Sequence, residues 1–279
     1  MDKPAGATSH DVVAIVRRQL SCRAVGHTGT LDPFATGLLV LVIGGATRLA
    51  RFVEAGTKRY RATALFGTAT TTDDVTGEPI GTPYQGAWPE EASVERAMAS
   101  LIGTIAQRPP VFSAKLVDGV RSYRLARAGN AVTLDEAMVR VEALAIASYR
   151  PPALEFVADV GPGTYLRSIA RDLGERLGVA AHLTSLRREQ VGRFRVDDAV
   201  ALEKVSQTTG LVSPLDLVGD MPRVELTAAE VAAVRQGRVV GAVPPMAEQT
   251  SALVHGGELV AIGTPREGRW QPVTVLGPE

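Results

Sequence analysis

The hydrophobic and polar positions of the chain follow two spacings, which predict helices and strands separated by Gly- and Pro-rich turns. Helical spacing predicts helices over 11–20, 44–56, 90–102, 120–128, 164–178 and 226–236. Alternation or short apolar runs predict strands over 38–43, 58–67, 138–147, 153–160, 252–255, 258–263 and 270–276. Hydroxyl side chains stand at or just before the start of three of these helices, so we expect Ser9, Thr164 and Thr227 to act as N-caps.

The stretch 26–37 combines three glycines and three threonines with a single carboxylate, Asp32. Pro33 restricts Asp32 to an extended conformation. The apolar run 38–43 follows at once and is rich in β-branched residues, which indicates a buried strand. A carboxylate on a stiff loop beside a buried strand is held in place, as a reactive group requires. An Asp-Pro pair in such a loop is equally typical of a plain turn, and both interpretations stand at this point.

Length and composition narrow the class of protein. The 279 residues are 45% hydrophobic, which predicts one large domain with a smaller one, or two of moderate size. No apolar run approaches the roughly 20 residues that a membrane-spanning helix needs, and the start of the chain has no signal-peptide pattern. The single Cys22 excludes an internal disulfide and fits a cytoplasmic protein. The four histidines show no metal-ligand spacing, and no dinucleotide fingerprint is present.

Charge is segregated along the chain, although the formal net charge is zero. Nine basic residues stand against four acidic ones in 1–72, and seven stand against three in 163–195. Residues 196–279 reverse this balance, with six basic and eleven acidic residues. Of the 30 basic residues 26 are arginines, whose planar fork suits phosphates and base edges. The positive segments surround the candidate loops, which indicates a nucleic-acid partner.

Five sequence motifs occur in the order found in one enzyme family. The strongest is Gly26-His27-x-Gly29-x-Leu31-Asp32-Pro33-x-Ala35-x-Gly37. It resembles the catalytic loop of the TruB family of tRNA pseudouridine synthases at every fixed position. The other motifs are Lys3-Pro4-x-Gly6, Gln107-x-Pro109-Pro110, Gly163-Thr164-Tyr165-Leu166-Arg167 and the segment 182–195. The resemblance therefore covers nearly the whole chain.

Three departures from the family pattern accompany these matches. Thr71 stands where the family commonly has Asp, in the loop Gly67-x-x-Thr70-Thr71-Thr72-Asp73-Asp74-x-x-Gly77. We expect this change to affect only the hydrogen bonds of the loop. In the motif that starts at Gln107, the position where the family has a lysine is occupied by Leu116, and Lys115 lies one residue before it. Family members also have a short strand before Lys-Pro, whereas this sequence starts almost at that motif. The edge strand of the central sheet is therefore not assigned at this point.

The resemblance implies the pseudouridine synthase fold. This is an α+β fold with a mixed, mainly antiparallel central sheet flanked by helices, plus a small C-terminal PUA-like β-barrel domain. The implied synthase domain spans 1–214, with an RNA-gripping insert at about 107–130, and the implied PUA-like domain spans 222–279. Its acidic balance is unusual for an RNA-binding module.

The implied reaction is isomerisation of the T-loop uridine of tRNA, at position 55, to pseudouridine. The base is flipped out, its glycosidic bond is cleaved, and the base is re-attached through carbon, with no cofactor and no metal. Asp32 is the implied catalytic nucleophile, with attack on sugar C1′ or on base C6 both open. Arg167 stands near a helix start, where the dipole disfavours a cation, so we expect a specific anionic partner, with Asp32 the candidate. Such a cation lowers the pKa of a carboxylate and keeps it ionised.

The remaining implied site residues contact the substrate. Tyr60 would stack on the flipped uracil, Leu186 would lie against it, and His27 would hold the distorted loop. Tyr165 would contact the uracil or assist removal of the C5 proton. Expected contacts with the RNA backbone come from Lys3, Arg121, Arg124, Arg187 and Arg188. The implied partner is the T-arm stem-loop of tRNA, bound by a monomer with no membrane association.

Two alternatives to this activity remain at the level of sequence. One is a tRNA-binding or tRNA-folding protein without catalysis, against which the presence of both Asp32 and Arg167 argues. The other is a pseudouridine synthase with a different RNA target, such as a guide-directed enzyme. The absence of long basic tails favours the stand-alone type.

Overall fold

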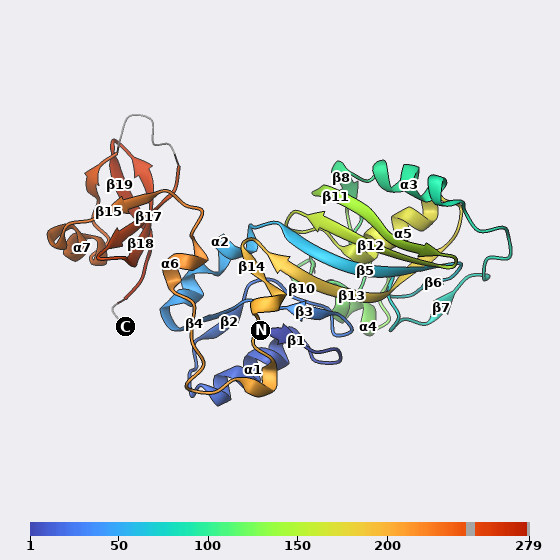
Figure 1. The fold of residues 1–279 in the computed structure, drawn as a ribbon, viewed down its shortest axis with the longest axis horizontal. Helices are drawn as coiled ribbons and strands as arrows, with labels where there is room; N and C mark the ends of the chain where they lie inside the picture. The colour runs from blue at the N-terminus through green and yellow to red at the C-terminus, as the bar shows by residue number, and fades with distance from the viewer. Residues whose placement is uncertain (244–248, 278–279) are drawn as a thin grey trace. The chain divides into compact units, whose positions relative to one another are not determined.

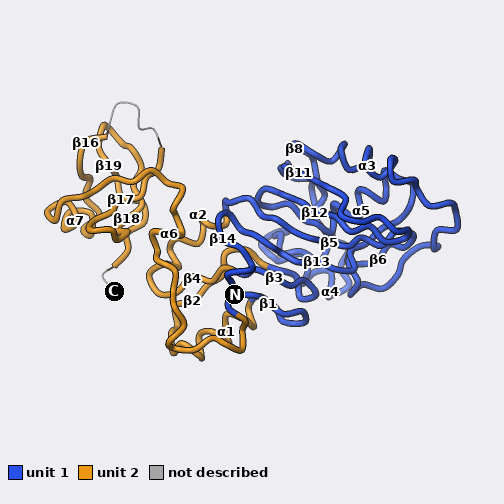
Figure 2. Tube along the Cα trace, viewed as in Figure 1, with its two compact units in different colours: residues 1–9, 31–39, 55–200 blue, residues 10–30, 40–54, 201–279 orange. Residues whose placement is uncertain are grey.

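The computed structural model describes residues 1–243 and 249–277 (Figure 1). The chain divides into two compact units, each assembled from several segments (Figure 2). The first unit contains residues 1–9, 31–39 and 55–200, and the second contains 10–30, 40–54 and 201–279. In the described part of the chain, no helix has the length and apolar character needed to cross a membrane.

The first unit is built on an eight-stranded sheet with the order β1-β3-β13-β5-β12-β11-β8, where β14 pairs with β13. Its strands are β1 (Asp2–Lys3), β3 (Thr36–Leu38), β5 (Lys58–Phe66), β8 (Gly103–Gln107), β11 (Ala137–Arg150), β12 (Ala153–Val160), β13 (Ala181–Val191) and β14 (Phe194–Arg195). Only β3 and β13 run parallel, so the sheet is mixed and mainly antiparallel, as predicted. The edge strand that the sequence left open is formed by Asp2 and Lys3 themselves.

Two helices, α3 (Glu91–Ala99) and α5 (Leu166–Arg176), lie on one face of this sheet (Figure 1). Successive side chains of a strand point to opposite faces, so β5 buries every second residue, from Lys58 to Phe66. Tyr60 and Phe66 on β5 share one core with Ile169 and Leu173 on α5. The predicted strand 58–67 and helix 164–178 are thereby confirmed as the two halves of this core.

Smaller elements of the first unit are β6 (Ala69–Thr70), β7 (Pro79–Ile80), β9 (Leu116–Val117), β10 (Val120–Arg121), α4 (Ser122–Arg127) and η2 (Val196–Asp198). The helix predicted over 120–128 begins only at Ser122. Val120 and Arg121 pair instead with Val117 and Leu116 in a hairpin, and this removes Arg121 from the helix.

The apolar run 38–43 is not one strand. Its first residue ends β3 in the first unit, and its last three form β4 (Leu41–Ile43), which pairs with β2 (Val25–His27) in the second. Between the two strands, the Leu39 amide donates to the Met1 carbonyl and the Val40 carbonyl accepts from the Thr28 amide. All these positions are apolar, so periodicity alone could not reveal the break.

Two of the three expected helix caps are wrong. Ser9 is the first residue of α1 (Ser9–Gln19), and its buried hydroxyl accepts a hydrogen bond from the Leu31 amide at 2.9 Å. Thr164 precedes α5 by two positions and donates to the Arg140 carbonyl at 3.3 Å. Thr227 does cap α7 (Ala228–Arg235), in a reciprocal capping box with Glu230.

The second unit contains a five-stranded sheet with the order β15-β17-β18-β19-β16. These strands are β15 (Arg223–Glu225), β16 (Val240–Ala242), β17 (Ser251–His255), β18 (Glu258–Arg266) and β19 (Arg269–Val275). The other elements are α1, α7, β2, β4, η1 (Gly44–Leu49), α2 (Ala50–Glu54), η3 (Leu202–Lys204) and α6 (Pro214–Leu217). The three strands predicted here are present, and the PUA-like barrel stays a prediction.

One hydrophobic core of the second unit combines residues near position 49 with residues between 215 and 276. Leu49, fully buried at the end of η1, packs in one cluster with Leu215, Ile262 and Leu276. Hydrogen bonds strengthen this connection, because the Arg48 guanidinium donates to the Val275 carbonyl at 2.7 Å. The segment 40–54 is therefore part of the fold of the C-terminal residues.

Candidate active site

Asp32 and Arg167 form a bidentate ion pair in the first unit. Arg167 Nε lies 2.9 Å from Asp32 Oδ2, and Arg167 Nη2 lies 3.0 Å from Oδ1. The Arg167 side chain is 3% exposed, whereas that of Asp32 is 30% exposed. The contact expected from the helix-dipole argument is present, and it leaves the carboxylate open to solvent on the side away from the guanidinium.

The remaining donors of Arg167 contact two further loops. Nη1 donates to the Thr72 carbonyl at 2.9 Å and lies 3.5 Å from Asp74 Oδ2, and Nη2 donates to the Phe112 carbonyl at 3.0 Å. A buried cation is tolerated only when such partners replace the water that it has lost. Arg167 therefore fixes the relative positions of the loops that carry Asp32, Asp74 and Phe112.

Asp74 is a site residue that sequence reasoning missed. It is buried, and its Oδ1 accepts hydrogen bonds from Thr72 Oγ1 at 2.7 Å, from the Thr76 amide at 2.9 Å and from Thr76 Oγ1 at 2.5 Å. The available signal was its place in the motif 67–77, which indicated a loop but not a partner for Arg167. In the same loop, Thr71 Oγ1 accepts a hydrogen bond from the Glu78 amide at 3.1 Å.

Burial raises the pKa of Asp32 above the usual value of an aspartate. The Arg167 guanidinium opposes this rise, and the nearby charge of Asp74 adds to it. The sequence led us to expect a lowered pKa. That expectation is wrong in direction, because desolvation of the carboxylate outweighs the attraction of the cation.

Tyr60 and Leu186 lie in the same apolar cluster as Leu31, the residue before Asp32. They come from the neighbouring strands β5 and β13, where Ala62 pairs with Leu186. Both side chains therefore belong to the core that also contains Leu31, and their contact with a base stays a prediction.

Tyr165 is fixed by Gln107 at both backbone groups. Its amide donates to Gln107 Oε1 at 2.9 Å, and its carbonyl accepts from Gln107 Nε2 at 3.2 Å. Burial raises the pKa of the Tyr165 hydroxyl, and a hydrogen bond with Ser113 opposes that rise. The raised pKa keeps the Tyr165 hydroxyl protonated, and its hydrogen bond connects it to the insert through Ser113.

Two expected phosphate contacts are corrected by the structure. Lys3 is fully buried, and its ammonium donates to the carbonyls of Pro4, Ala7 and Pro33 at 2.9, 2.7 and 3.3 Å. Arg188 is 1% exposed, and its Nε donates to the Leu38 carbonyl at 2.7 Å. Both cations bind the backbone inside the protein, so neither side chain reaches an RNA phosphate.

Arg187 differs from Arg188 in remaining half-exposed, where it pairs with Asp2 at 2.8 Å. The parallel contact between β3 and β13 beside it depends on Gly37. Gly37 has a φ of 100°, and a Cβ there would lie 2.3 Å from the Arg188 carbonyl oxygen. The last glycine of the motif 26–37 is therefore required by strand packing.

The insert presents an exposed basic surface. Arg121 ends β10, and Arg124 and Arg127 stand on α4. Arg124 Nε donates to the Tyr123 hydroxyl at 3.3 Å, and the Arg127 guanidinium lies 5.9 Å from the centre of the Tyr123 ring. Arginines beside a half-exposed aromatic ring suit the backbone and bases of RNA.

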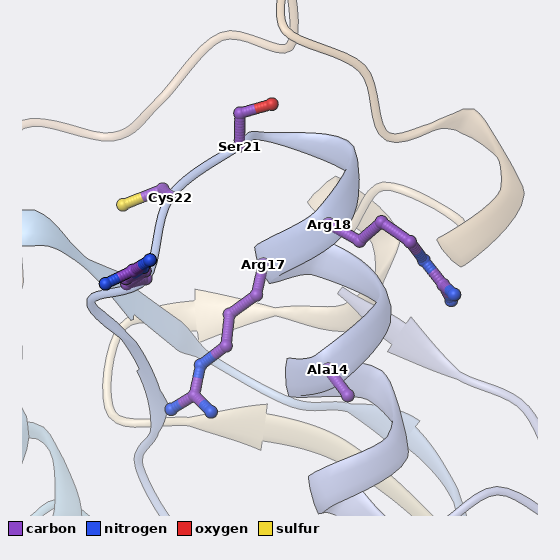
Figure 3. A pocket seen from close by; sticks show the side chains of 6 residues that line it. Ala14, Arg17, Arg18, Ser21 and Cys22 are labelled. Atoms are coloured by element: carbon purple, nitrogen blue, oxygen red, sulfur yellow. The ribbon is translucent and has the colours of Figure 1, made fainter.

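His27 and a second basic surface belong to the second unit. The His27 ring on β2 meets the His10 ring edge-to-face, with centres 5.4 Å apart. A surface pocket at the end of α1 is lined by Ala14, Arg17, Arg18, Ser21, Cys22 and Arg23 (Figure 3). Arg17 and Arg18 point to different sides of the helix, and Arg17 donates to the Val25 carbonyl at 2.7 Å. The role of His27 beside the substrate stays a prediction.

Within residues 1–243 and 249–277, no group of three or more His, Cys, Asp or Glu side chains is arranged to hold a metal ion.

The comparisons with known proteins support one class, the pseudouridine synthases. The structure titled "Crystal Structure of a Cbf5-Nop10-Gar1 Complex" matches 99% of this chain and 82% of its own, with a TM-score of 0.71 and 26% identity. A second, "Structure of H/ACA RNP bound to a substrate RNA containing 2'-deoxyuridine", has a TM-score of 0.71 at 23% identity over 99% of this chain and 84% of its own, and shows the fold alone.

Residues 17–166 match the TruB family pseudouridylate synthase N-terminal domain, and residues 167–214 match the tRNA pseudouridylate synthase B C-terminal domain. The chain belongs to the TruB family. A relative from Mycobacteroides abscessus, named tRNA pseudouridine synthase B, is 43% identical over 100% of this chain and 95% of its own length. Another of the same name, from Geobacter sulfurreducens, is 39% identical over 98% of this chain and 95% of its own length.

Proposed function

We propose that this chain isomerises the T-loop uridine of tRNA, at position 55, to pseudouridine, with Asp32 as the nucleophile. The observation that carries the proposal is the bidentate pair of Asp32 with buried Arg167, which leaves one side of the carboxylate open. Relatives that match nearly the full length of the chain carry the name tRNA pseudouridine synthase B, which supports tRNA as the substrate.

The reaction needs a carboxylate held in one orientation and an extruded base. The C1′–N1 bond of the uridine breaks while Asp32 bonds to the sugar C1′ or the base C6. The base turns and its C5 bonds to C1′; on the C1′ route this displaces Asp32 from the sugar, and on the C6 route Asp32 leaves the base afterwards. The C5 proton leaves and N1 gains a proton, so no oxidant or reductant is needed. Two hydrogen bonds from Arg167 stabilise the carboxylate and aim it at the sugar or the base.

The base is held by the apolar side chains beside Asp32. Extrusion from a loop costs a few kcal/mol, and stacking on an aromatic ring offsets part of it. Tyr60 supplies the ring, and Leu186 the opposing apolar contact. His27 holds the loop from which the base has left. Tyr165, with a raised pKa and a fixed backbone, contacts the uracil or takes part in proton removal at C5.

The RNA backbone is bound by other side chains. Arg121 and Arg124 on the insert meet phosphates of the T-arm stem-loop, together with Arg187, which lies on β13 and pairs with Asp2 of the edge strand β1. The proposed enzyme acts as a cytoplasmic monomer without cofactor. The catalytic domain over 1–214 and the PUA-like domain over 222–279 are parts of the same proposal.

The test uses purified full-length protein and a T-arm stem-loop RNA, with pseudouridine and binding measured separately. Wild type is expected to modify the T-loop uridine, and Asp32→Asn is expected to bind equally well and make no product. Product from Asp32→Asn would remove Asp32 as the nucleophile. Wild type that binds without modifying would favour the RNA-binding alternative, and mapping pseudouridine in total tRNA would reveal a different target.

A further inference from the structure

A second arginine on α5, Arg171, lies one helical turn beyond Arg167 and contacts a separate set of groups. Arg171 Nη1 donates to Asp73 Oδ2 at 3.0 Å, and its Nε and Nη2 donate to Asp172 Oδ1 at 3.0 and 2.8 Å. Nη2 also donates to the Arg108 carbonyl at 2.8 Å. The side chain is 22% exposed, so most of its guanidinium serves these internal contacts.

Asp73 occupies the turn on which Arg167 depends. Its φ of 59° is left-handed, a conformation that Asp and Asn adopt more readily than most residues. The Asp73 carbonyl accepts from the Leu183 amide at 3.1 Å, and the preceding Thr72 carbonyl accepts from Arg167 at 2.9 Å. Arg171 and Arg167 therefore donate hydrogen bonds to adjacent residues of one turn, Asp73 and Thr72.

The same helix also holds both ends of the segment that opens the insert. The Arg108 carbonyl accepts from Arg171 and, at 2.8 Å, from Ser168 Oγ. Four residues later, the Phe112 carbonyl accepts from Arg167 at 3.0 Å. A displacement of Arg171 would thus loosen two of the segments against which Arg167 is fixed.

We propose that Arg171, through Asp73 and the Arg108 carbonyl, is a positioning residue that fixes Arg167 and thereby the orientation of Asp32. The inference rests on the proposed function. Arg171 touches neither reacting group. It acts by holding the turn and the insert, and a misplacement of about 1 Å at a reacting group is enough to lower a rate on the order of a hundredfold.

The charges around the pair are consistent with this role. Burial raises the pKa of Asp73, and both Arg171 and Arg167 oppose the rise. Burial likewise raises the pKa of Asp172, again opposed by Arg171. The second arginine thus offsets the charges of both carboxylates, of which Asp73 also interacts with Arg167.

The experiment measures kcat and KM on T-arm RNA for Arg171→Met, Asp73→Asn and the double variant. Asn keeps the left-handed turn and removes only the charge. The control is Arg176→Met, on the same helix at an exposed position. Each single variant is expected to lose about tenfold in kcat or more, with KM within about twofold. The double variant is expected to have the same kcat as the less active single variant, because the two residues act as one unit.

Arg171→Lys provides a second variant that keeps the charge and loses the fork. It is expected to retain the Asp73 pair and recover part of the lost kcat. Three results would overturn the inference alone: losses that add in the double variant, an increase in KM with kcat unchanged, or a lower melting temperature with wild-type kcat. A wild-type enzyme inactive on every tRNA would instead overturn the proposed function, and this inference with it.

Discussion

The guanidinium of Arg167 and the carboxylate of Asp32 meet across 135 positions of sequence through two nearly parallel hydrogen bonds of 2.9 and 3.0 Å. One partner is almost completely buried and the other keeps an open side. Substitutions at the two positions should therefore have different effects. A change at Arg167 alters the fold, and a change at Asp32 alters the chemistry.

Replacing Arg167 by Met is expected to lower the free energy of unfolding by about 3–5 kcal/mol, since Asp74 stays buried without its cation. Urea denaturation measures this change. The matched control is Arg59→Met, which removes the exposed pair with Asp159 and should cost at most about 1 kcal/mol. Equal stability of the Arg167→Met and wild-type proteins would contradict the inferred role of the cation.

The rate of pseudouridine formation is expected to fall on the acid side at a higher pH than an ordinary aspartate would give. Burial raises the pKa of Asp32, so the carboxylate gains its proton, and the nucleophile is lost, earlier as pH falls. Asp74→Asn removes a negative charge that raises this pKa, and the acid limb should move to lower pH. A limb that stays in place or moves upward would argue against Asp32 as the titrating group.

Tyr60→Leu is expected to lower kcat/KM by about tenfold to a hundredfold, corresponding to the loss of one base-stacking contact of about 1–3 kcal/mol. Tyr60→Phe keeps the ring and should remain close to wild type. Because Tyr60 is also buried in the core, melting temperatures of both variants are measured in parallel. Similar losses for Leu and Phe would assign the effect to the hydroxyl.

Arg124→Gln is expected to reduce the salt dependence of T-arm binding, by about 0.7–1 in the slope of log K against log salt concentration. Arg124 is exposed on the insert and its Nε bonds a tyrosine hydroxyl, which leaves other donors for phosphate. Binding is titrated from about 50 to about 200 mM salt. Arg59→Gln, whose cation is already paired with Asp159, should leave the slope unchanged.

Local periodicity predicted the elements that bury one face. The strand 58–67 and the helix beginning near 164 follow from spacing alone, and a cation against the helix dipole correctly pointed to Asp32 as the partner of Arg167. Asp74 escaped this reasoning, because an acid in a Thr-rich turn satisfies local hydrogen bonds and gives no sign of a distant cation.

Buried cations were the least predictable feature. Lys3 and Arg188 have the sequence appearance of surface groups, and only the folded backbone supplies the carbonyls that receive them. The break within 38–43 escaped for a related reason: apolar residues on both sides of it are buried, in different sheets. Pairing partners, not composition, decide such cases.

The cluster around Leu49 bears on how this protein can diverge or be engineered. Side chains between Leu215 and Leu276 pack on residues near position 49, which lie far earlier in the sequence. Recombination therefore cannot delete the C-terminal portion, or exchange it between relatives, without exposing or mismatching this core. Each transplant would need matching changes at Ala46, Leu49 and Phe52.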